Sequence, residues 1–330
     1  GQMADFHLQA GYSDPAALQQ LGAACAAITT EFENVPAASL IELARHCRVS
    51  PDAAAVAIVQ DRSHEKSWLA DQGFATAPFA IIENEADLAA ALAATGTPAL
   101  LKVSRFGYDG KGQARVSTLD EAHAAFSAFG SQACVLEGFV KLECEVSVVL
   151  ARSDAGECRL FPTAENRHVN GILDVSIVPA RVSEKLAQQA REMARAVADQ
   201  LGYVGVMAVE FFVVDGRLMI NEIAPRPHNS GHYTLDACVT DQFEQQVRAL
   251  AGLPLGDTRL LSPVAMVNIL GDRWQHGEPH WEALLAHPAI KLHLYGKQAA
   301  RPGRKMGHFN VLDADLNAAL ELAEQMRDAL

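Results

Sequence analysis

Cysteine is scarce in this sequence, and its cysteines are not spaced for a metal site. No Cys-x-x-Cys pair occurs, and no histidine lies near a cysteine at the spacing of a zinc ligand set. Sparse cysteines of this kind are typical of proteins kept in a reducing compartment. We therefore expect a cytoplasmic protein with reduced structural thiols at Cys25, Cys47, Cys134, Cys144, Cys158 and Cys238.

Positive charge and long apolar runs are also in short supply. The chain has 27 Lys and Arg residues against 40 Asp and Glu residues, a formal charge of -13, which disfavours binding to nucleic acid or to an anionic membrane. No uncharged apolar run is long enough to span a bilayer, and residues 1–5 lack the basic and apolar segments of a signal peptide. Because position 1 is Gly, we expect the numbered chain to begin inside a longer protein.

What the sequence does contain is typical of a folded protein with helices and strands. Its 330 residues, 49% hydrophobic and 20% charged, suit about two domains of roughly 150 residues. Up to about residue 60, short apolar runs alternate with helical stretches, which predicts an α/β layer with parallel strands. Asp14, directly before Pro15, and Asn34, two residues before Pro36, are expected helix N-termini. The predicted elements here are strands at 6–8 and 26–30 and helices at 15–24 and 36–46.

Beyond residue 60 the pattern predicts a larger region of strands and helices. The strongest local signal is Asp215-Gly216 between two apolar runs, which is typical of a β-hairpin. Helices are predicted at 65–72, 87–94, 120–129, 184–201, 280–286 and the C-terminus, and strands at 79–82, 99–103, 114–116, 134–137, 145–151, 158–162, 206–214, 218–223, 265–270, 291–295 and 308–312.

A glycine-rich loop, Gly107 to Gln113, joins two of these strands. Its backbone N–H groups can lie against phosphate oxygens while Lys111 supplies charge, and Lys102 on the preceding strand can reach the same phosphates. The loop matches neither a Walker A motif nor Gly-x-Gly-x-x-Gly. A hairpin tip without function is the alternative.

Glu210 and Glu222 lie on the two arms of the Asp215-Gly216 hairpin, and paired carboxylates suit Mg²⁺. A plain two-residue turn would set Glu210 opposite Asn221 and turn Glu222 to the other face. The metal hypothesis therefore requires an odd loop or a β-bulge. Two surface charges are the alternative, although a carboxylate within the apolar run around Glu210 is expensive to bury without a partner.

Two further segments are rich in hydrogen-bond donors. Residues 226–232 directly follow the hairpin, and their two prolines and one glycine predict a loop. Residues 297–305 carry Lys297, Arg301, Arg304 and Lys305, a local reversal of the acidic balance that suits an anionic small molecule. Plain solvated loops are the alternative for both segments.

Six sequence blocks follow one another along the chain: Glu31–Pro36, Asp61-Arg62 with Glu65-Lys66, Gly107–Gln113, Ala164–His168, Asn221–His232 and Gly303–His308. In this order they resemble the ATP-grasp superfamily and, within it, the 5-(carboxyamino)imidazole ribonucleotide synthases of purine biosynthesis. The resemblance runs along essentially the whole chain and implies an α/β (α+β) fold. The implied parts are a partial, Rossmann-like pre-ATP-grasp domain at 1–60, an ATP-grasp domain at 61–255 and a small C-terminal domain at 256–330. Family members open with a strand and a Gly-rich turn that we do not find in this sequence.

The resemblance implies an ATP-dependent ligase that carboxylates 5-aminoimidazole ribonucleotide with bicarbonate, through carboxyphosphate, and that uses Mg²⁺. By position, ATP would be bound by Arg62, Lys102, Gly107, Tyr108, Asp109, Gly110, Lys111, Gly112, Gln113, Glu137, Gly138, Phe139, Val140, Glu145, His168, Asn221 and Glu222. Glu210 and Glu222 would hold the metal. The catalytic residues would be Arg226, His228, Asn229, Lys297 and Arg304. The substrates would be surrounded by Glu31, Glu33, Tyr108, Asp109, Arg226, Lys297, Arg304 and Lys305.

The same resemblance implies a cytoplasmic homodimer whose partners are small molecules, with no nucleic acid or membrane. Many ATP-grasp enzymes carry Glu-x-Asn at the second metal position, whereas this chain has Glu222-Ile223-Ala224 and so offers fewer protein ligands to each metal ion. An ATP- and formate-dependent glycinamide ribonucleotide formyltransferase is the alternative within the superfamily. A nucleotide-binding module without catalysis is the alternative from another class.

Overall fold

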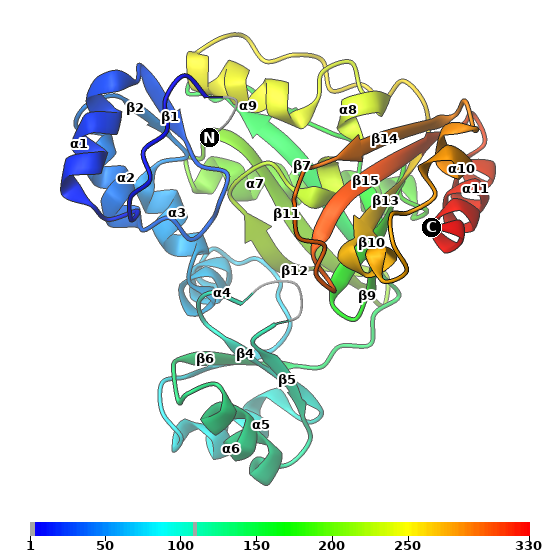
Figure 1. Cartoon of the computed structure of the whole chain (residues 1–330). Helices are drawn as coiled ribbons and strands as arrows, with labels where there is room; N and C mark the ends of the chain where they lie inside the picture. Colours follow the sequence, from blue (N-terminus) through cyan, green and yellow to red (C-terminus); the bar gives the residue numbers. More distant parts are fainter. Residues whose placement is uncertain (1–3, 108–110) are drawn as a thin grey trace.

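The computed structural model describes residues 4–107 and 111–330, which form an N-terminal part, a small lobe and a large sheet (Figure 1). Strands of the N-terminal part form one parallel pair, which confirms the predicted α/β layer. Its elements are α1 (Pro15–Ala24), β1 (Ala27–Thr29), α2 (Ala37–Leu43), β2 (Arg48–Ser50) and α3 (Ala53–Val59).

Three sequence signals in the N-terminal part have different outcomes. Asp14 caps α1, because its side chain accepts hydrogen bonds from the backbone N–H groups at 16 and 17. Asn34 is not a cap, since α2 has Pro36 at its N-cap and no side-chain cap bond. The predicted strand at 6–8 is also wrong: within the described residues β1 and β2 pair only with each other, and Phe6 stays 47% exposed.

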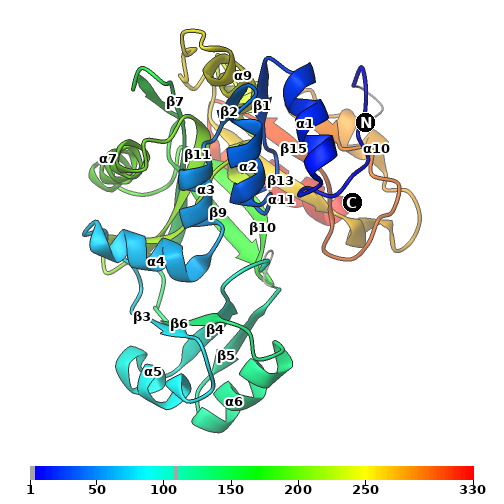
Figure 2. The same ribbon diagram turned by 90° about the vertical axis from the view of Figure 1, so that its left-hand side faces the viewer.

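The small lobe is a four-stranded antiparallel sheet with two helices packed on it. The strand order is β3-β6-β4-β5, and Leu88, Leu101 and Leu136 are fully buried in its core. Helix α4 (Arg62–Asp71) lies where the lobe meets the rest of the molecule (Figure 2). The lobe consists of β3 (Phe79–Ile82), α5 (Asp87–Thr95), β4 (Ala99–Val103), β5 (Gln113–Val116), α6 (Leu119–Ala128) and β6 (Cys134–Gly138).

A nine-stranded antiparallel sheet forms the body of the molecule, in the order β12-β11-β7-β9-β10-β13-β15-β14 with β8 paired to β7. It continues without a break from β10 to β13, so strands on both sides of residue 255 share one sheet. The domain limits at 60/61 and 255/256 stay predictions. The strands are β7 (Cys144–Arg152), β8 (Cys158–Leu160), β9 (Ala164–Val169), β10 (Ile172–Val178), β11 (Gly205–Val214), β12 (Arg217–Ala224), β13 (Val264–Leu270), β14 (Ile290–Leu294) and β15 (Lys305–Leu312).

Helices cover both faces of this sheet. Successive residues of β7, such as Val148 and Val149, enter different cores because side chains alternate along a strand. One core lies under α7 (Glu184–Gln200), and the other lies under α8 (Thr234–Ala237) and α9 (Gln242–Ala251). A third core packs β13 and β15 against α10 (Trp281–Leu285) and α11 (Leu316–Ala329). Two short 3-10 helices, Asn229–Gly231 and Gly271–Trp274, complete the described elements.

Two absences predicted from the sequence can be checked against the structure. Within the described ranges, no helix combines the length and the apolarity needed to cross a bilayer. All six cysteines lie in those ranges, and each is a free thiol in the structure.

Candidate active site

The turn of the β11–β12 hairpin has two residues. Asp215 and Gly216 lie between the paired residues Val214 and Arg217, and their φ angles are 49° and 66°. Two positive φ values in a row are those of a type I′ turn, the common turn of tight hairpins. Such an even turn would by itself put the two predicted metal ligands on opposite faces of the sheet.

A β-bulge farther along the hairpin changes that outcome. The register is regular as far as the pair Phe211–Ile220 and then shifts by one residue, so that Glu210 pairs directly with Glu222. Asn221 is the extra residue of the bulge. The structure thus fulfils the condition that the metal hypothesis set, by a bulge and with a turn that is even. Both carboxylates lie on one face of the sheet.

The Glu210 carboxyl group is buried among other acids. It is 9% exposed, and burial, reinforced by the charges of Glu222 and Glu145, raises its pKa to about 8. His228 offers Nε2 at 3.4 Å from Glu210 Oε1, but burial keeps the pKa of this histidine well below its ordinary value. The group therefore lies in an environment that favours either a proton or an added cation.

Glu222, across the hairpin, already has a cationic partner. Arg62 Nη2 lies 3.1 Å from Glu222 Oε2. Burial by itself would raise the pKa of Glu222, but the Arg62 guanidinium outweighs it and lowers the pKa below the ordinary value. The two facing carboxyl groups are therefore electrostatically unequal.

A second buried acid, Glu137 on β6, collects three cations. Lys102 Nζ lies 2.9 Å from Glu137 Oε2, Lys66 Nζ lies 3.7 Å from the same atom, and Arg62 Nη1 lies 3.8 Å from Glu137 Oε1. Burial opposes ionisation of Glu137, but these three charges lower its pKa to about 2. The predicted phosphate-binding residues Arg62 and Lys102 are thus gathered in one network at the junction of α4, the small lobe and β12.

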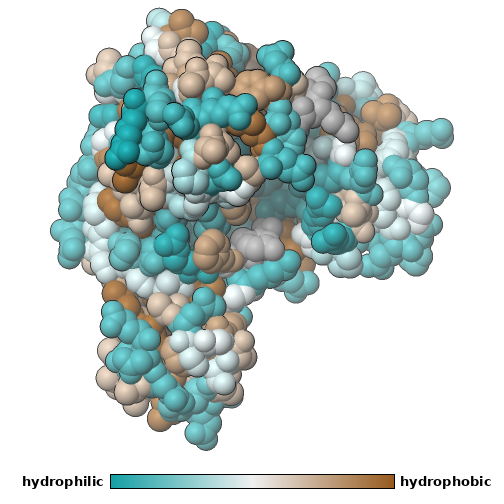
Figure 3. Space-filling model, turned by 60° about the vertical axis from the view of Figure 1, so that its left-hand side comes forward, coloured by the Kyte–Doolittle hydropathy of each residue, from teal (hydrophilic) through white to brown (hydrophobic). Residues whose placement is uncertain are grey.

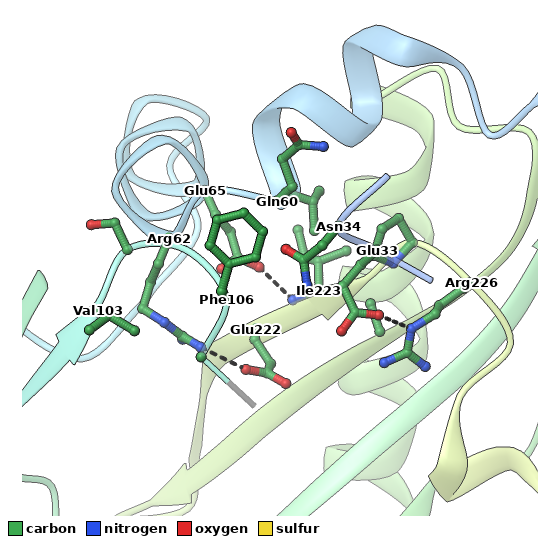
Figure 4. A pocket seen from close by; sticks show the side chains of 15 residues that line it. Glu33, Asn34, Gln60, Arg62, Glu65, Val103, Phe106, Glu222, Ile223 and Arg226 are labelled. Atoms are coloured by element: carbon green, nitrogen blue, oxygen red, sulfur yellow. Dashed lines mark hydrogen bonds and ion pairs between the residues drawn. The ribbon is translucent and has the colours of Figure 1, made fainter. Parts of the chain in front are cut away.

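A pocket opens beside this network. Figure 3 shows a hollow above the small lobe with mostly hydrophilic residues around it, and Figure 4 shows the lining residues. The carboxylate of Glu33, from the N-terminal part, accepts a hydrogen bond from the guanidinium of Arg226, whereas Glu31 is exposed. The lining is Glu33, Asn34, Val59, Gln60, Arg62, Glu65, Val103, Ser104, Phe106, Gly107, Glu222, Ile223, Ala224, Pro225 and Arg226.

The glycine-rich loop joins β4 to β5 at the edge of this pocket. Tyr108, Asp109 and Gly110 lie outside the described residues. Gly112 has a φ of 73°, and a Cβ atom there would come 2.6 Å from Val103 Cγ2, so this position requires glycine. The end of β4 contacts the described part of this loop, which comprises Gly107, Lys111, Gly112 and Gln113. The backbone N–H of Val103 donates to the carbonyl oxygen of Gly112 at 2.8 Å, and Gln113 pairs with Lys102.

The residues predicted to contact adenine and ribose lie at the junction of the small lobe with the large sheet. Gly138 ends β6, and a Cβ atom there would come 2.7 Å from the Thr95 carbonyl oxygen. Phe139 and Val140 follow in the connection to β7, where the Arg115 guanidinium lies 4.7 Å from the centre of the Phe139 ring. These residues belong to the segment that connects the sheet of the small lobe to the large sheet.

Glu145 and His168 form an ion pair on neighbouring strands, with His168 Nδ1 2.9 Å from Glu145 Oε2. Burial would lower the pKa of His168, but the bond to Glu145 outweighs it and the pKa is raised. With Glu210 the pair offers three ligand atoms within 4.8 Å of one another. His168 offers a nitrogen atom, whereas Mg²⁺ prefers oxygen ligands, so Glu210 with Glu222 remains the set that suits Mg²⁺.

The loop that follows the hairpin is fixed by hydrogen bonds to the start of α9 and to β13. His228 exchanges two backbone hydrogen bonds of 2.8 Å with the Gln242 side chain. Its Nδ1 atom lies 2.9 Å from Ser230 Oγ. Asn229 and Asn268 exchange side-chain hydrogen bonds of 2.9 and 2.6 Å. This predicted loop contains one 3-10 turn and is rigidly held.

The basic loop, 297–305, joins β14 to β15. Lys297 and Arg304 are exposed and donate to backbone carbonyls of the loop itself, at 2.7 and 2.8 Å. Lys305 begins β15, and its charge contributes to the lowered pKa of His228. A hydrogen bond of 2.8 Å between Tyr295 and His308 joins the ends of the loop. The structure thus brings Lys305 near the acidic hairpin and leaves Lys297 and Arg304 at the rim.

Sequence reasoning missed several residues that the structure brings to the site. Gln242, at the start of α9, and Asn268, on β13, belong to no motif, and only their contacts with the loop after the hairpin reveal them. Glu65 and Lys66 belong to a recognised block, but no role follows from their position in it. Among the described residues, four atoms of the predicted nucleotide site are buried without a partner that meets hydrogen-bond geometry, which favours a polar ligand there: Arg62 Nη1, Glu137 Oε1, His168 Nδ1 and Asn221 Oδ1.

Comparisons with family profiles match almost the whole chain. A profile of the ATP-grasp domain matches residues 67–243, and one of the phosphoribosylaminoimidazole carboxylase C-terminal domain matches residues 264–322. A profile of the ribonucleotide synthetase preATP-grasp domain matches residues 1–60.

Individual relatives are similar in sequence and in structure. The N5-carboxyaminoimidazole ribonucleotide synthase of Brucella melitensis is 48% identical over 93% of this chain and 84% of its own length. An ADP complex of an N5-carboxyaminoimidazole ribonucleotide synthetase is 43% identical, with a TM-score of 0.91 over 98% of this chain and 86% of that one. The Aspergillus clavatus N5-carboxyaminoimidazole synthase, solved with ADP and 5-aminoimidazole ribonucleotide, is 30% identical, with a TM-score of 0.91 over 99% and 87% of the two chains.

Proposed function

The chain belongs to the N5-carboxyaminoimidazole ribonucleotide synthase family of ATP-grasp enzymes, and from that premise we propose how its residues carry out the reaction. It is an ATP-dependent ligase of purine biosynthesis that carboxylates 5-aminoimidazole ribonucleotide. We propose further that bicarbonate supplies the carboxyl group and that carboxyphosphate is the intermediate.

The observation that carries this proposal is the bulged hairpin. It sets Glu210 opposite Glu222, beside the guanidinium of Arg62 and the network around Glu137. Transfer of a phosphoryl group requires charge neutralisation and alignment more than covalent help from the protein. A site with facing carboxylates and gathered cations supplies both.

Mg²⁺ is the cofactor that these residues fit. Two carboxylates on one face are hard oxygen ligands, and the raised pKa of Glu210 marks a carboxyl group that lacks a positive partner. Bound there, Mg²⁺ would neutralise charge on the ATP phosphates. Glu210 and Glu222 would hold it, with Asn221 beside them.

On the nucleotide side we assign the phosphates to Arg62, Lys102 and the glycine-rich loop. The three cations around Glu137 are held at fixed positions, so no large rearrangement is needed when ATP enters. Adenine and ribose would lie along residues 137–140 with Glu145 and His168. The ADP and ATP complexes of similar structures support a nucleotide at this fold.

For the second substrate we assign bicarbonate to Arg226, His228 and Asn229. A bicarbonate oxygen attacks the γ-phosphorus of ATP, the bond to the β-phosphate oxygen breaks, and ADP leaves. The exocyclic amine of the ribonucleotide then attacks the carboxyl carbon of carboxyphosphate. The bond from that carbon to the phosphate oxygen breaks, and phosphate departs with the proton of the amine. Arg226, which Glu33 orients, would stabilise the charge on the acyl phosphate.

The ribonucleotide phosphate is assigned to the basic loop. Arg304 offers a planar fork and Lys305 a point charge, with Lys297 beside them. Glu33 closes the pocket from the N-terminal part. The homodimer and the cytoplasmic location that the sequence resemblance implies stay predictions.

An ADP-release assay tests the proposal. ADP release should require Mg²⁺, bicarbonate and 5-aminoimidazole ribonucleotide together, and formate should not replace bicarbonate. Turnover with formate and glycinamide ribonucleotide would instead support the formyltransferase alternative, which the similarity to N5-carboxyaminoimidazole ribonucleotide synthases disfavours. Nucleotide binding without turnover would support the binding module.

A further inference from the structure

One face of helix α4 meets the bulged part of β12. Arg62, Glu65 and Lys66 are spaced i, i+3 and i+4, so their side chains point from the same side of the helix. Opposite them lie three consecutive residues of β12, 221–223, which include the extra residue of the bulge. Arg62 binds the side chain of the middle one, Glu222.

The other two α4 residues bind the backbone on either side of that glutamate. Lys66 Nζ donates to the carbonyl oxygen of Asn221 at 2.8 Å. The backbone N–H of Ile223 donates to Glu65 Oε1 at 2.6 Å, as Figure 4 shows. The two side chains therefore grip the strand immediately before and immediately after Glu222.

A bulge at this place requires such partners. Strand β12 is the last strand of the sheet, so its outer backbone groups have no neighbouring strand over this stretch. The N–H of Ile220 donates to the Ala75 carbonyl oxygen at 2.7 Å, and the next outward N–H is that of Ile223. These two outward N–H groups are three residues apart, whereas in a regular strand outward N–H groups are an even number of residues apart, and the odd spacing results from the bulge. A buried N–H or C=O group without a partner is unfavourable, so the bulge needs groups outside the sheet to bind its backbone.

Burial makes the same point from the side of the helix. Glu65 is 3% exposed and Lys66 is 0% exposed, and buried charges are unfavourable unless they are paired or hydrogen-bonded. The Ile223 N–H stabilises the carboxylate, and the Asn221 carbonyl oxygen, together with Glu137 at 3.7 Å, stabilises the ammonium group. A helix whose only task was to cover the sheet would present apolar side chains at these two positions.

We propose that Glu65 and Lys66 are positioning residues that hold the bulge at Asn221 and so keep Glu222 opposite Glu210. Without them the extra residue can move along β12, and a shift of one position turns Glu222 to the other face. The expected effect on Mg²⁺ binding rests on the proposed function, whereas the two hydrogen bonds to the bulge are present in the fold without a ligand.

Two conservative variants separate the hydrogen bond from the charge. Glu65→Gln keeps an acceptor oxygen at the same reach and loses the charge. Glu65→Asp keeps the charge but is shorter by one methylene group, so it cannot reach the Ile223 N–H. Lys66→Met removes the donor to Asn221 at similar volume. His64→Ala, at an exposed position of α4, is the matched control for the helix.

Two measurements on the full chain read the effect. The first is amide exchange at Ile223 without ligand, which should accelerate about tenfold or more in Glu65→Asp. The second is the ratio of ADP affinities with and without Mg²⁺, which should fall about tenfold in Glu65→Asp and Lys66→Met. Glu65→Gln and His64→Ala should stay within about threefold of the parent protein on both.

Damage in Glu65→Gln as large as in Glu65→Asp, or failure of Glu65→Gln to fold, would overturn the proposal, because the acceptor would then not be what matters. Unchanged exchange and an unchanged Mg²⁺ ratio in folded Glu65→Asp would overturn it as well. If circular dichroism shows that Glu65→Asp does not fold, Lys66→Met decides by the same two measurements. Absence of any Mg²⁺ effect on ADP binding in the parent protein would refute the metal assignment alone, since the exchange measurement still decides whether the bulge is held.

Discussion

The β11–β12 hairpin and the basic loop at 297–305 hold their charged side chains in different surroundings. Glu210 and Glu222 are carboxyl groups on strands of the sheet, and side chains from α4 and from the loop after the hairpin surround them. Lys297 and Arg304 stand on an exposed loop and donate to backbone carbonyls of that same loop. The hairpin therefore holds Glu210 in the interior and Glu222 half-buried beside the pocket, whereas the loop keeps its charges in water.

This difference shows which charged side chains the fold positions before any ligand binds. Burying a carboxyl group is expensive, so its position must be fixed by partners before any ligand binds. An exposed cation loses little of its hydration and contributes strongly only when an anion joins it. We therefore expect variants of the hairpin to change the chemical step, and variants of the loop to change the affinity for the ribonucleotide.

The largest effect is expected from Glu222→Gln. The change keeps the shape and removes the charge that would hold Mg²⁺, so turnover should fall roughly a hundredfold or more, while the fold persists. ADP release at saturating substrates measures it. Glu157→Gln, at an exposed glutamate in the connection between β7 and β8, is the control. ADP release within about threefold of the parent rate would remove Glu222 from the metal site.

The next effect is expected in the basic loop, from Arg304→Ala. Loss of a charge-assisted bond to phosphate, roughly 1.5–3 kcal/mol, should raise KM for 5-aminoimidazole ribonucleotide by well over about tenfold and leave KM for ATP nearly unchanged. Arg301→Ala in the same loop is the matched control. An effect confined to ATP would move the loop to the nucleotide site, and no effect would leave it a solvated turn.

A smaller effect concerns the pH dependence of stability, through Glu210. Its pKa is about 8 in the fold against an ordinary 4.5, so the folded protein holds the proton more tightly than the unfolded chain does. Ionisation therefore destabilises the ligand-free fold; the penalty is absent below about pH 4.5, grows as the pH rises, and is complete above about pH 8. Glu210→Gln cannot ionise and should avoid it.

Thermal unfolding at several pH values between 5 and 8.5, without nucleotide or Mg²⁺, measures this difference. The Tm of Glu210→Gln minus the Tm of the parent protein should increase by at least about 2 °C between pH 5 and pH 8.5. Glu65, whose pKa burial raises to about 7, titrates in both proteins and largely cancels in the comparison. A constant difference in Tm would show that Glu210 is already ionised at pH 5.

The smallest effect on activity is expected at the hairpin tip, from Gly216→Ala. A side chain at a φ of 66° costs about 1 kcal/mol of stability, but turnover should stay within about twofold, because the bulge and not the tip decides how the carboxylates face. Chemical denaturation and the ADP assay measure the two quantities. A fall in turnover beyond about fivefold would mean that the turn also sets the register at Glu222.

Much of the fold could be predicted from the sequence because its signals are local. The apolar runs around Asp215-Gly216 are fixed by residues next to them, and the long amphipathic pattern at 184–201 matches α7 closely. The predicted elements omit strands β9 and β10 and helix α9. The two strands carry polar side chains, Asn166 and Ser176, which are buried and bonded to each other at 2.8 Å. Strand β9 is mostly polar, so its pattern resembles a loop, whereas β10 alternates between apolar and polar residues from 173 to 177, a signal that favours a strand.

The features of the candidate site likewise divide into those set by neighbouring residues in the sequence and those set by tertiary contacts. The sequence by itself determined which side chains are available: two glutamates on the arms of one hairpin, a lysine before a glycine-rich loop, and a run of donors after the hairpin. It also favoured a tight turn, because Asp-Gly is typical of two-residue hairpin turns. These features depend on residues close together in the chain.

Only the tertiary structure decided that Glu222 faces Glu210. The bulge at Asn221 is met by groups far away in sequence, since the Ile223 bond to Glu65 spans 158 residues and the bond from Lys66 spans 155. An extra residue in a strand has no preferred place until its unpaired backbone groups find partners. Those partners exist only after α4 has packed against the edge of the sheet, and so the geometry of the carboxylates belongs to the assembled fold.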